Sequence, residues 1–163
     1  MTASPDLVLR TYRPDDHDRV VALNRYGLAA AGVPLEQDVY AGDLDDVEVT
    51  YPSGRGVLLV GEVDGEVVAM GGLRQVESGT CEILRMRVDP QYQGRGHGRA
   101  MLCALEDHAL RLGYEQVTLL TGPDQHPAIE LYRNTGYREI AVEDHGDLRG
   151  VRLAKALVSQ RPE

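Results

Sequence analysis

Short apolar runs separated by turn residues recur along the chain, and they predict several strands. Apolar residues alternate loosely over residues 7–12, which predicts a first strand. The runs at 57–63 and 66–73 flank Asp64 and Gly65, and an Asp-Gly pair suits a tight hairpin turn. The remaining runs predict strands at residues 81–88, 116–120, 137–142 and 151–157.

Apolar residues at helical spacing predict helices between these strands. The first helix begins at Pro14, because proline suits the first helical position, and it runs to about residue 28. A shorter helix is predicted at 35–44. Helices at 96–112 and 127–134 are each closely followed by a glycine, which suits a helix end. Strands and helices thus alternate, which indicates the α/β (α+β) class.

Length and composition indicate one globular domain over residues 1–163. The chain is 42% hydrophobic and 26% charged, as expected for such a domain. Its longest apolar runs have strand length and its first residues lack a signal-peptide pattern, so we expect a cytoplasmic protein without a membrane partner. The cysteines and histidines show no metal-ligand spacing; we therefore expect no metal, and we interpret the histidines as surface residues.

Charge is distributed unevenly along the chain. The net charge of −9 argues against a nucleic-acid partner, because nucleic-acid-binding domains carry a basic face. Residues 85–99 nevertheless hold four arginines against Asp89 alone, which predicts an anionic ligand there. Residues 36–48 hold six carboxylates and no Lys or Arg. Two interpretations of this acidic segment remain open: it attracts a cationic ligand, or it is a solvated face.

The stretch QGRGHGR at residues 93–99 follows a predicted strand and begins a predicted helix. Backbone N–H groups are free at a helix N-terminus and glycines allow close approach, so this loop suits a phosphate group. A dinucleotide-binding G-x-G-x-x-G pattern fails, because its last position would be Arg99 or Met101. A P-loop also fails, because the chain contains no Gly-Lys-Ser or Gly-Lys-Thr.

Two motifs together resemble the GNAT superfamily of acyl-CoA-dependent N-acyltransferases. The family's pyrophosphate loop, Q/R-x-x-G-x-G/A, is matched by Gln93, Gly96 and Gly98. The segment QHPAIELYRNTGY is similar to the family's Asn-x-x-Ala-Ile-x-Leu-Tyr-x-x-x-Gly-Phe, and the resemblance covers about residues 81–137. It implies a mixed, mostly antiparallel sheet of six or seven strands, flanked by about four helices, with splayed fourth and fifth strands.

The resemblance implies acetyl-CoA as co-substrate, bound between the strands at 81–88 and 116–120. Backbone groups of Met86 and Val88 would pair with the pantetheine arm, although both could equally be core residues. Gln125 replaces the asparagine common in the family, which leaves its contact with CoA open. The pyrophosphate would be held by Gln93, Gly94, Arg95, Gly96, His97, Gly98 and Arg99.

Two residues are catalytic candidates. An alkylammonium of pKa near 10.4 leaves about one molecule in 2,500 as free amine at pH 7, so a base is useful. Glu82 stands where several family members carry that base, and regular strand geometry would place it on one face with Leu84, Met86 and Val88. Its alternative interpretation is a solvated carboxylate. Tyr132 matches the family tyrosine that hydrogen-bonds or protonates the CoA sulfur; its alternative is core filling.

The sequence therefore predicts an N-acetyltransferase that moves acetyl from acetyl-CoA to a primary amine by direct attack in a ternary complex. The alternative is a non-catalytic acyl-CoA-binding or sensing domain that keeps the loop without the chemistry. The acceptor is left open between a small amine and a protein amine, and the length of the acyl group is open too. The oligomeric state is also open, with a homodimer among the alternatives.

Overall fold

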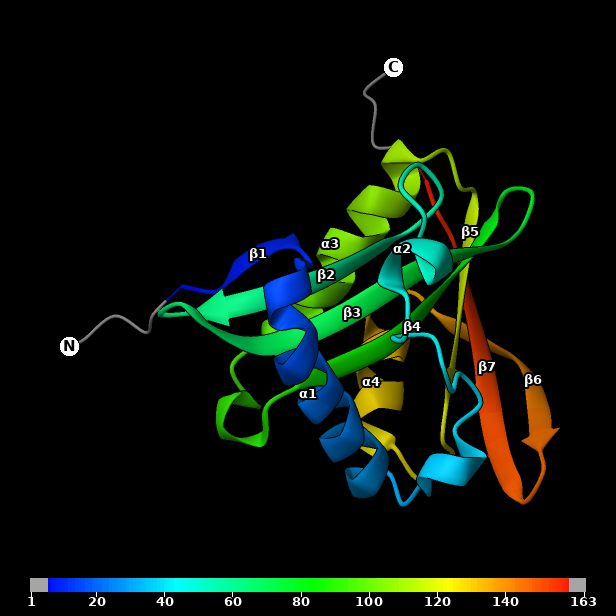
Figure 1. Ribbon diagram of the computed structural model, residues 1–163. Helices are drawn as coiled ribbons and strands as arrows, with labels where there is room; N and C mark the ends of the chain where they lie inside the picture. The colour runs from blue at the N-terminus through cyan, green and yellow to red at the C-terminus, as the bar shows by residue number, and fades with distance from the viewer. Residues whose placement is uncertain (1–5, 159–163) are drawn as a thin grey trace.

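A seven-stranded sheet forms the centre of the protein in the computed structural model, which describes residues 6–158 (Figure 1). The spatial order of the strands is β1-β2-β3-β4-β5-β7-β6. All neighbours are antiparallel except β4 and β5, which are parallel. The mixed, mostly antiparallel sheet is confirmed. The strands are β1 Val8–Thr11, β2 Val57–Val63, β3 Glu66–Glu77, β4 Thr80–Val88, β5 Gln116–Thr121, β6 Arg138–His145 and β7 Leu148–Ala156.

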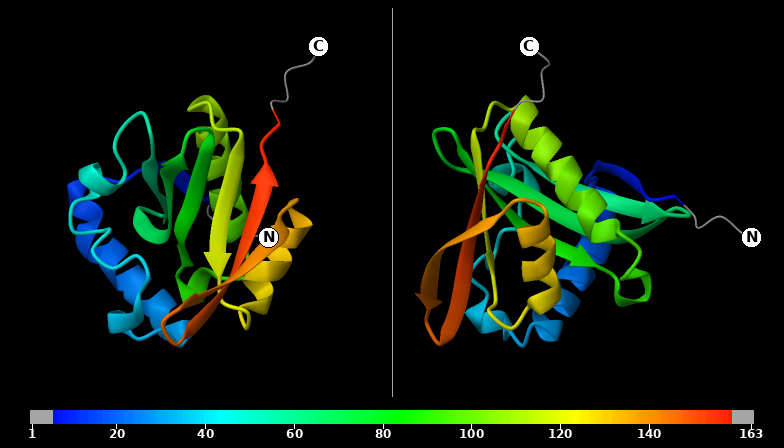
Figure 2. Two further views of the ribbon diagram at one scale, coloured as in Figure 1. Left: turned by 90° about the vertical axis from the view of Figure 1, so that its right-hand side faces the viewer. Right: turned by 180° about the vertical axis from the view of Figure 1, so that it is seen from behind.

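Helices cover both faces of the sheet (Figures 1 and 2). On one face lie α1 (His17–Ala30) and the short α2 (Val47–Thr50). On the opposite face lie α3 (His97–Arg111) and α4 (His126–Asn134). Short 3-10 turns occur at Pro14–Asp16, Leu35–Gln37 and Pro90–Tyr92.

Apolar side chains form one cluster on each face of the sheet. Leu59 of β2 packs with Met101 and Leu105 under α3, whereas its neighbour Leu58 packs with Val20 under α1. Successive residues of a strand point to opposite faces, so a strand covered on both sides must be apolar throughout. This explains why the β2 sequence reads as a continuous apolar run rather than an alternating one.

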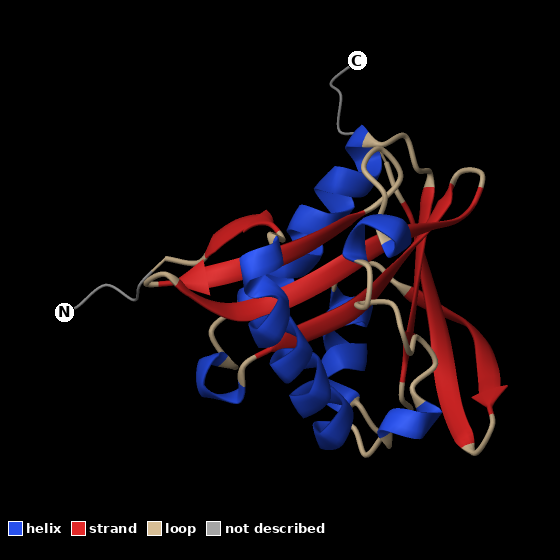
Figure 3. Ribbon diagram, in the orientation of Figure 1, coloured by secondary structure: helices blue, strands red, loops and turns tan. Residues whose placement is uncertain are grey.

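Strands β4 and β5 are paired at one end and separated at the other. Their ladder contains the pairs Thr80↔Gln116, Cys81↔Val117 and Glu82↔Thr118, and β4 continues to Val88 without β5 beside it. Figure 3 shows β5 turning away from β4 with β7 and β6. The predicted splay of the fourth and fifth strands is confirmed.

A β-bulge interrupts β4 at Arg85. Leu84 pairs with Gly72 of β3 and Arg87 pairs with Met70, so two β4 residues stand opposite one β3 residue. Arg85 has the left-handed φ of 59°, which is uncommon for a residue with a side chain. The extra residue shifts the alternation of side chains between the faces.

The prediction that Glu82, Leu84, Met86 and Val88 share one face is wrong for this reason. Leu84 packs in the cluster under α1. Met86 and Val88, beyond the bulge, pack against the cluster under α3 and α4. Because of the bulge, Met86 and Val88 point to the opposite face of the sheet from Leu84.

Two other segments test the turn and helix predictions. The Asp64-Gly65 hairpin is confirmed, with φ of 52° and 79° at these positions. The helix predicted at 35–44 is wrong: a single 3-10 turn ends at Gln37 and irregular chain follows to α2. Asp38 and Asp43 in this segment bind Arg85, and those long-range ion pairs override the local pattern.

Candidate active site

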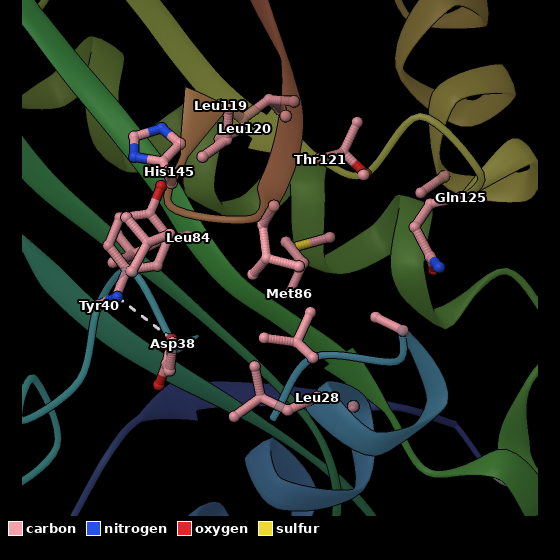
Figure 4. A pocket seen from close by; sticks show the side chains of 18 of the residues that line it. Leu28, Asp38, Tyr40, Leu84, Met86, Leu119, Leu120, Thr121, Gln125 and His145 are labelled. Carbon is pink, nitrogen blue, oxygen red and sulfur yellow. Dashed lines mark hydrogen bonds between the residues drawn. The ribbon is translucent and has the colours of Figure 1, made fainter. Parts of the chain in front are cut away.

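A cavity of about 450 Å³ lies where β4 and β5 separate (Figure 4). Leu28 and Tyr40 line it from the α1 side, and Gln125 and Tyr132 line it from the α4 side. The cavity therefore lies at the splay and is lined by residues from both faces of the sheet. Of the predicted site residues, it is lined by Met86, Gln125 and Tyr132, while Glu82, Val88 and the loop at 93–99 lie outside its lining.

Tyr132 places its ring in the core and its hydroxyl at the cavity. The side chain is buried, and its ring meets that of Tyr137 edge-on at 5.7 Å. Among residues 6–158 the hydroxyl has no hydrogen-bond partner, yet no fully buried side-chain oxygen lacks one, so this hydroxyl is reached from the cavity. Burial raises the pKa of Tyr132 to about 12, with the charge of Arg87 opposing this. The hydroxyl stays protonated at neutral pH and can donate to a ligand.

Glu82 is buried at the last paired position of β4 and β5, and both of its oxygens are engaged. Oε1 accepts from Nε and Nη2 of Arg74 at 3.0 and 2.9 Å. Oε2 accepts from the Tyr40 hydroxyl at 2.7 Å and from Nη1 of Arg152 at 2.6 Å. Burial acts to raise the pKa of Glu82, but hydrogen bonds from Arg152, Tyr40 and Arg74 outweigh it and lower the pKa. The solvated-carboxylate interpretation does not describe this residue.

His145, which the sequence suggested was a surface residue, lines the cavity beside a carboxylate. Its Nε2 lies 3.0 Å from Oε1 of Glu143. Arg152 donates to both oxygens of Glu143, at 2.7 and 2.9 Å, and thereby connects this pair to Glu82. Hydrogen bonds from Arg152, stronger here than the opposing effect of burial, and a further one from His145 lower the pKa of Glu143 to about 2.

A carboxylate that stays ionised can orient an imidazole and stabilise its protonated form. The Glu143–His145 pair is therefore a second candidate for proton transfer at the cavity. Its sequence signal is the Glu-x-His spacing within a strand, because residues two apart share a face.

The glycine loop at 93–99 leads from β4 into α3. Gly94 and Gly96 have left-handed φ of 77° and 83°, which explains why glycine occupies them. The Gln93 side chain donates to the carbonyl of Val88 at 3.0 Å, and so fixes the loop to the end of β4. Within residues 6–158, the backbone N–H groups of 94–99 have no protein acceptor. These N–H groups are available to an anion.

A side chain of the glycine loop contacts Tyr92, and the loop lies close to α4. The guanidinium of Arg95 lies over the Tyr92 ring, 5.2 Å from its centroid. A Cβ atom at Gly98 would lie 3.8 Å from Leu131 and 4.0 Å from Val88, so α3 starts beside α4. The loop is thus adjacent to the helix that supplies Tyr132.

The acidic segment at 36–48 has a role that neither sequence interpretation described. Asp38 accepts from Arg85 at 3.0 and 2.7 Å, and Asp43 accepts from it at 3.0 and 2.8 Å. The Tyr51 hydroxyl also donates to Asp43, at 2.8 Å. Two of the six carboxylates therefore neutralise a buried arginine of β4.

No metal cluster or membrane span is found in the part of the chain that the structure describes. Across residues 6–158, His, Cys, Asp and Glu side chains form no group of three or more that could hold a metal ion. None of the helices there is long and apolar enough to cross a bilayer.

The sequence and the fold were compared with those of known proteins. Residues 31–137 match the acetyltransferase (GNAT) family. Mycothiol acetyltransferase of Clavibacter sepedonicus is 34% identical over 138 residues, which are 84% of this chain and 44% of that relative. N-acetylaspartate synthetase of Rattus norvegicus is 33% identical over 116 residues, 70% of this chain and 39% of that relative. The chain spans less than half of the length of these relatives.

Solved structures show the same fold. A GNAT-family acetyltransferase of Staphylococcus aureus Mu50 superposes with a TM-score of 0.83 at 17% identity, covering 94% of this chain and 100% of that one. The structure of yncA from Salmonella typhimurium with its cofactor acetyl-CoA superposes with a TM-score of 0.75 at 20% identity, covering 97% and 98%. With the family match, the relatives and the splayed sheet in agreement, the chain belongs to the GNAT family of acetyltransferases.

Proposed function

We propose that this protein transfers an acetyl group from acetyl-CoA to a primary amine by direct attack in a ternary complex. The observation that carries the proposal is the cavity at the splay, where the Tyr132 hydroxyl has no hydrogen-bond partner among residues 6–158. A cavity lined from both faces would let the cofactor bind from the α3–α4 side and the acceptor from the α1 side. Membership of the GNAT family supports the same reaction class.

The acetyl-CoA pyrophosphate would bind the free N–H groups of the loop at 93–99, with Arg95 and Arg99 adding positive charge. The pantetheine arm would lie along the edge of β4 at Met86 and Val88, where β5 no longer occupies the edge. Gln125, at the start of α4 and on the cavity wall, is placed to contact the same arm.

In the reaction the amine nitrogen attacks the thioester carbon, a C–N bond forms, the C–S bond breaks, and CoA leaves as a thiolate. Tyr132 would donate its hydrogen bond to that sulfur. The surplus proton on nitrogen needs a base, which we predicted at Glu82. Glu82 is the weaker candidate, because its pKa is lowered and both of its oxygens are already engaged. His145 is the stronger candidate, because it lines the cavity and its ring is hydrogen-bonded to Glu143.

The acceptor is proposed to be a small molecule. The names of two relatives refer to small molecules, mycothiol and N-acetylaspartate. Asp38 and Tyr40 from the loop after α1, and His145 from β6, border the α1 side of the cavity, where the acceptor would bind (Figure 4).

The test combines binding with turnover. We expect acetyl-CoA to raise the melting temperature while NAD and ATP do not, because the site suits a pyrophosphate followed by an extended arm. Thiol release from acetyl-CoA, measured over a panel of amines, should then identify acceptors. No shift at millimolar acetyl-CoA contradicts the proposal. Tight acetyl-CoA binding without turnover of any amine would favour the sensing domain.

A further inference from the structure

Arg87 extends from the open end of β4 along α1 to the cavity. It lines the cavity, and its side chain passes directly over Gly27 of α1. A Cβ atom at Gly27 would lie 2.1 Å from Cδ of Arg87, so any larger residue there would displace the arginine. The glycine thus leaves room for a long cationic side chain between helix and strand.

Arg87 is bound weakly by the protein. Its Nε donates to Oδ1 of Asn24 at 3.3 Å, and its Nη1 donates to the Met86 carbonyl at 3.4 Å. Both bonds are long, and most of the five N–H donors of the guanidinium are left over. Within residues 6–158 Arg87 takes part in no ion pair, whereas Arg85, two residues earlier, is held by Asp38 and Asp43.

The surroundings of Arg87 disfavour an uncompensated charge. Burial lowers its pKa most and the neighbouring charge of Arg85 lowers it further, which together outweigh the opposing effects of Tyr132, Asp38 and Asp43. A partly buried cation is stable when an anion shares its environment, and a planar guanidinium suits the two oxygens of a carboxylate. Among residues 6–158 no carboxylate forms an ion pair with Arg87: the nearby charges of Asp38 and Asp43 act on it only from a distance, because both pair directly with Arg85. A ligand carboxylate can supply the direct partner that is missing.

The face of the sheet on which Arg87 lies indicates which ligand would supply the anion. Arg87 contacts α1 through Asn24 and Gly27, whereas Met86, Val88 and the start of α3 face the opposite side. We propose that Arg87 binds a carboxylate of the acceptor, so that the acceptor is an amino acid or another amine that carries a carboxylate. This inference rests on the proposed function, because it assigns the α1 side of the cavity to the acceptor.

The test compares matched acceptors in wild type and in Arg87→Met, which keeps the length and removes the charge. Each L-amino acid is paired with its decarboxylated amine, and thiol release gives kcat/KM for both. Wild type should prefer the amino acid by about 30-fold or more, the effect expected of a partly buried charge pair, and Arg87→Met should remove most of this preference. Equal kcat/KM for both members of every pair in wild type overturns the inference.

Two controls distinguish a bound acceptor carboxylate from general charge and from a CoA phosphate. Arg149 also lines the cavity, but it is exposed and pairs with Asp144, so Arg149→Met should leave the preference in place. An equal loss in Arg149→Met would mean that general charge, not a bound carboxylate, sets the preference. Acetyl-CoA affinity should be the same in Arg87→Met and wild type. A weaker affinity would assign Arg87 to a CoA phosphate and overturn the inference.

A binding measurement covers the case in which no acceptor is turned over. That outcome contradicts the proposed function, but the carboxylate site can still be examined with CoA-loaded protein. The amino acid should raise the melting temperature more than its decarboxylated amine, and Arg87→Met should abolish the difference, while Arg87→Lys should keep part of it. No difference between the two compounds in wild type overturns the carboxylate site itself.

Discussion

The two ends of β4 treat charge in opposite ways. At the end paired with β5, Glu82 is matched by Arg74 and Arg152, and the bulged Arg85 just beyond is matched by two aspartates. At the splayed end, within the described chain, Arg87 has two long hydrogen bonds but no carboxylate partner, and the Tyr132 hydroxyl and the N–H groups of 94–99 have no protein hydrogen-bond partner. Polar groups matched by the protein maintain the fold, whereas those left unmatched at the cavity and in the glycine loop are the groups available to ligands.

The largest expected effect separates the two arginines of β4. Arg85→Met leaves Asp38 and Asp43 without their cation, and removing one member of a buried charge cluster typically costs about 3–5 kcal/mol. Arg87 forms no ion pair with any residue from 6 to 158, so the free energy of unfolding of Arg87→Met should fall by less than about 1 kcal/mol. Urea unfolding of both variants measures the difference. Similar losses would remove the contrast between the two ends.

The second expected effect concerns two tyrosines whose rings touch. Tyr132→Phe should reduce turnover by roughly 10²-fold, within the range of a positioned acid. The melting temperature should stay near wild type, because the hydroxyl bonds to no other residue in the described part of the chain. Tyr137 donates to Glu106 at 2.8 Å and does not line the cavity. Tyr137→Phe should therefore lower stability without a comparable loss in kcat. The reverse pattern would contradict the role of Tyr132.

The third prediction identifies the base. Removing it should slow turnover by roughly 10²-fold near neutral pH, and the deficit should shrink as pH rises and solvent supplies free amine. We expect this pH dependence in His145→Gln. Glu82→Gln should instead show a deficit that does not change with pH, because it disturbs Arg74, Arg152 and Tyr40. A shrinking deficit in Glu82→Gln alone would restore Glu82 as the base.

The fourth prediction compares the two ends of α3. Gly96 and Gly113 have φ of 83° and 90°, so valine at either position should cost about 1–2 kcal/mol through backbone strain. Gly96→Val should in addition weaken acetyl-CoA binding about tenfold or more, because it alters the N–H groups that we assign to the pyrophosphate. Calorimetric titration gives the affinities. Equal affinities in the two variants would mean that the loop does not hold the cofactor.

The smallest expected effect is on acid stability. The pKa of Glu143 is lowered from 4.5 to about 2 in the folded chain, mainly by Arg152. A lowered carboxylate pKa stabilises the fold above the unfolded value, and this contribution is lost as pH falls from 4.5 toward 2. Melting temperatures between about pH 6 and pH 3 should fall less steeply in Glu143→Gln than in wild type. Parallel curves would contradict the lowered pKa.

Local sequence was sufficient to predict much of the fold. The Asp64-Gly65 turn and the helices at 96–112 and 127–134 depend on turn chemistry and periodicity, and the structure contains all three. The helix predicted at 35–44 is absent because two aspartates of this segment bind Arg85, which lies more than 40 residues away. The prediction that Glu82, Leu84, Met86 and Val88 share one face also failed, because nothing in the sequence around Arg85 indicates the extra residue of the bulge.

Some residues of the candidate site could be identified from local sequence, and others could not. Tyr132 and the loop at 93–99 stand in contiguous motifs, and the sequence could identify them as candidates. His145 and Arg87 gain their interest from their surroundings, namely Arg152 behind Glu143 and the space over Gly27. Gly27 lies far from Arg87 in the chain, and the cavity beside His145 is built from several separate segments, so the sequence alone could not predict these surroundings, although the Glu-x-His spacing is itself a local signal.

The bulge in β4 reverses which face of the sheet the following side chains point to. Without Arg85, the side chains of Met86 and Val88 would exchange faces with that of Arg87, because side chains alternate with a period of two. Deleting one residue would then turn the apolar edge toward α1 and the free cation toward α3. Under the proposed function, the acceptor side at Arg87 and the cofactor side at Met86 and Val88 therefore lie on opposite faces of one strand, and the bulge decides which residue faces which helix.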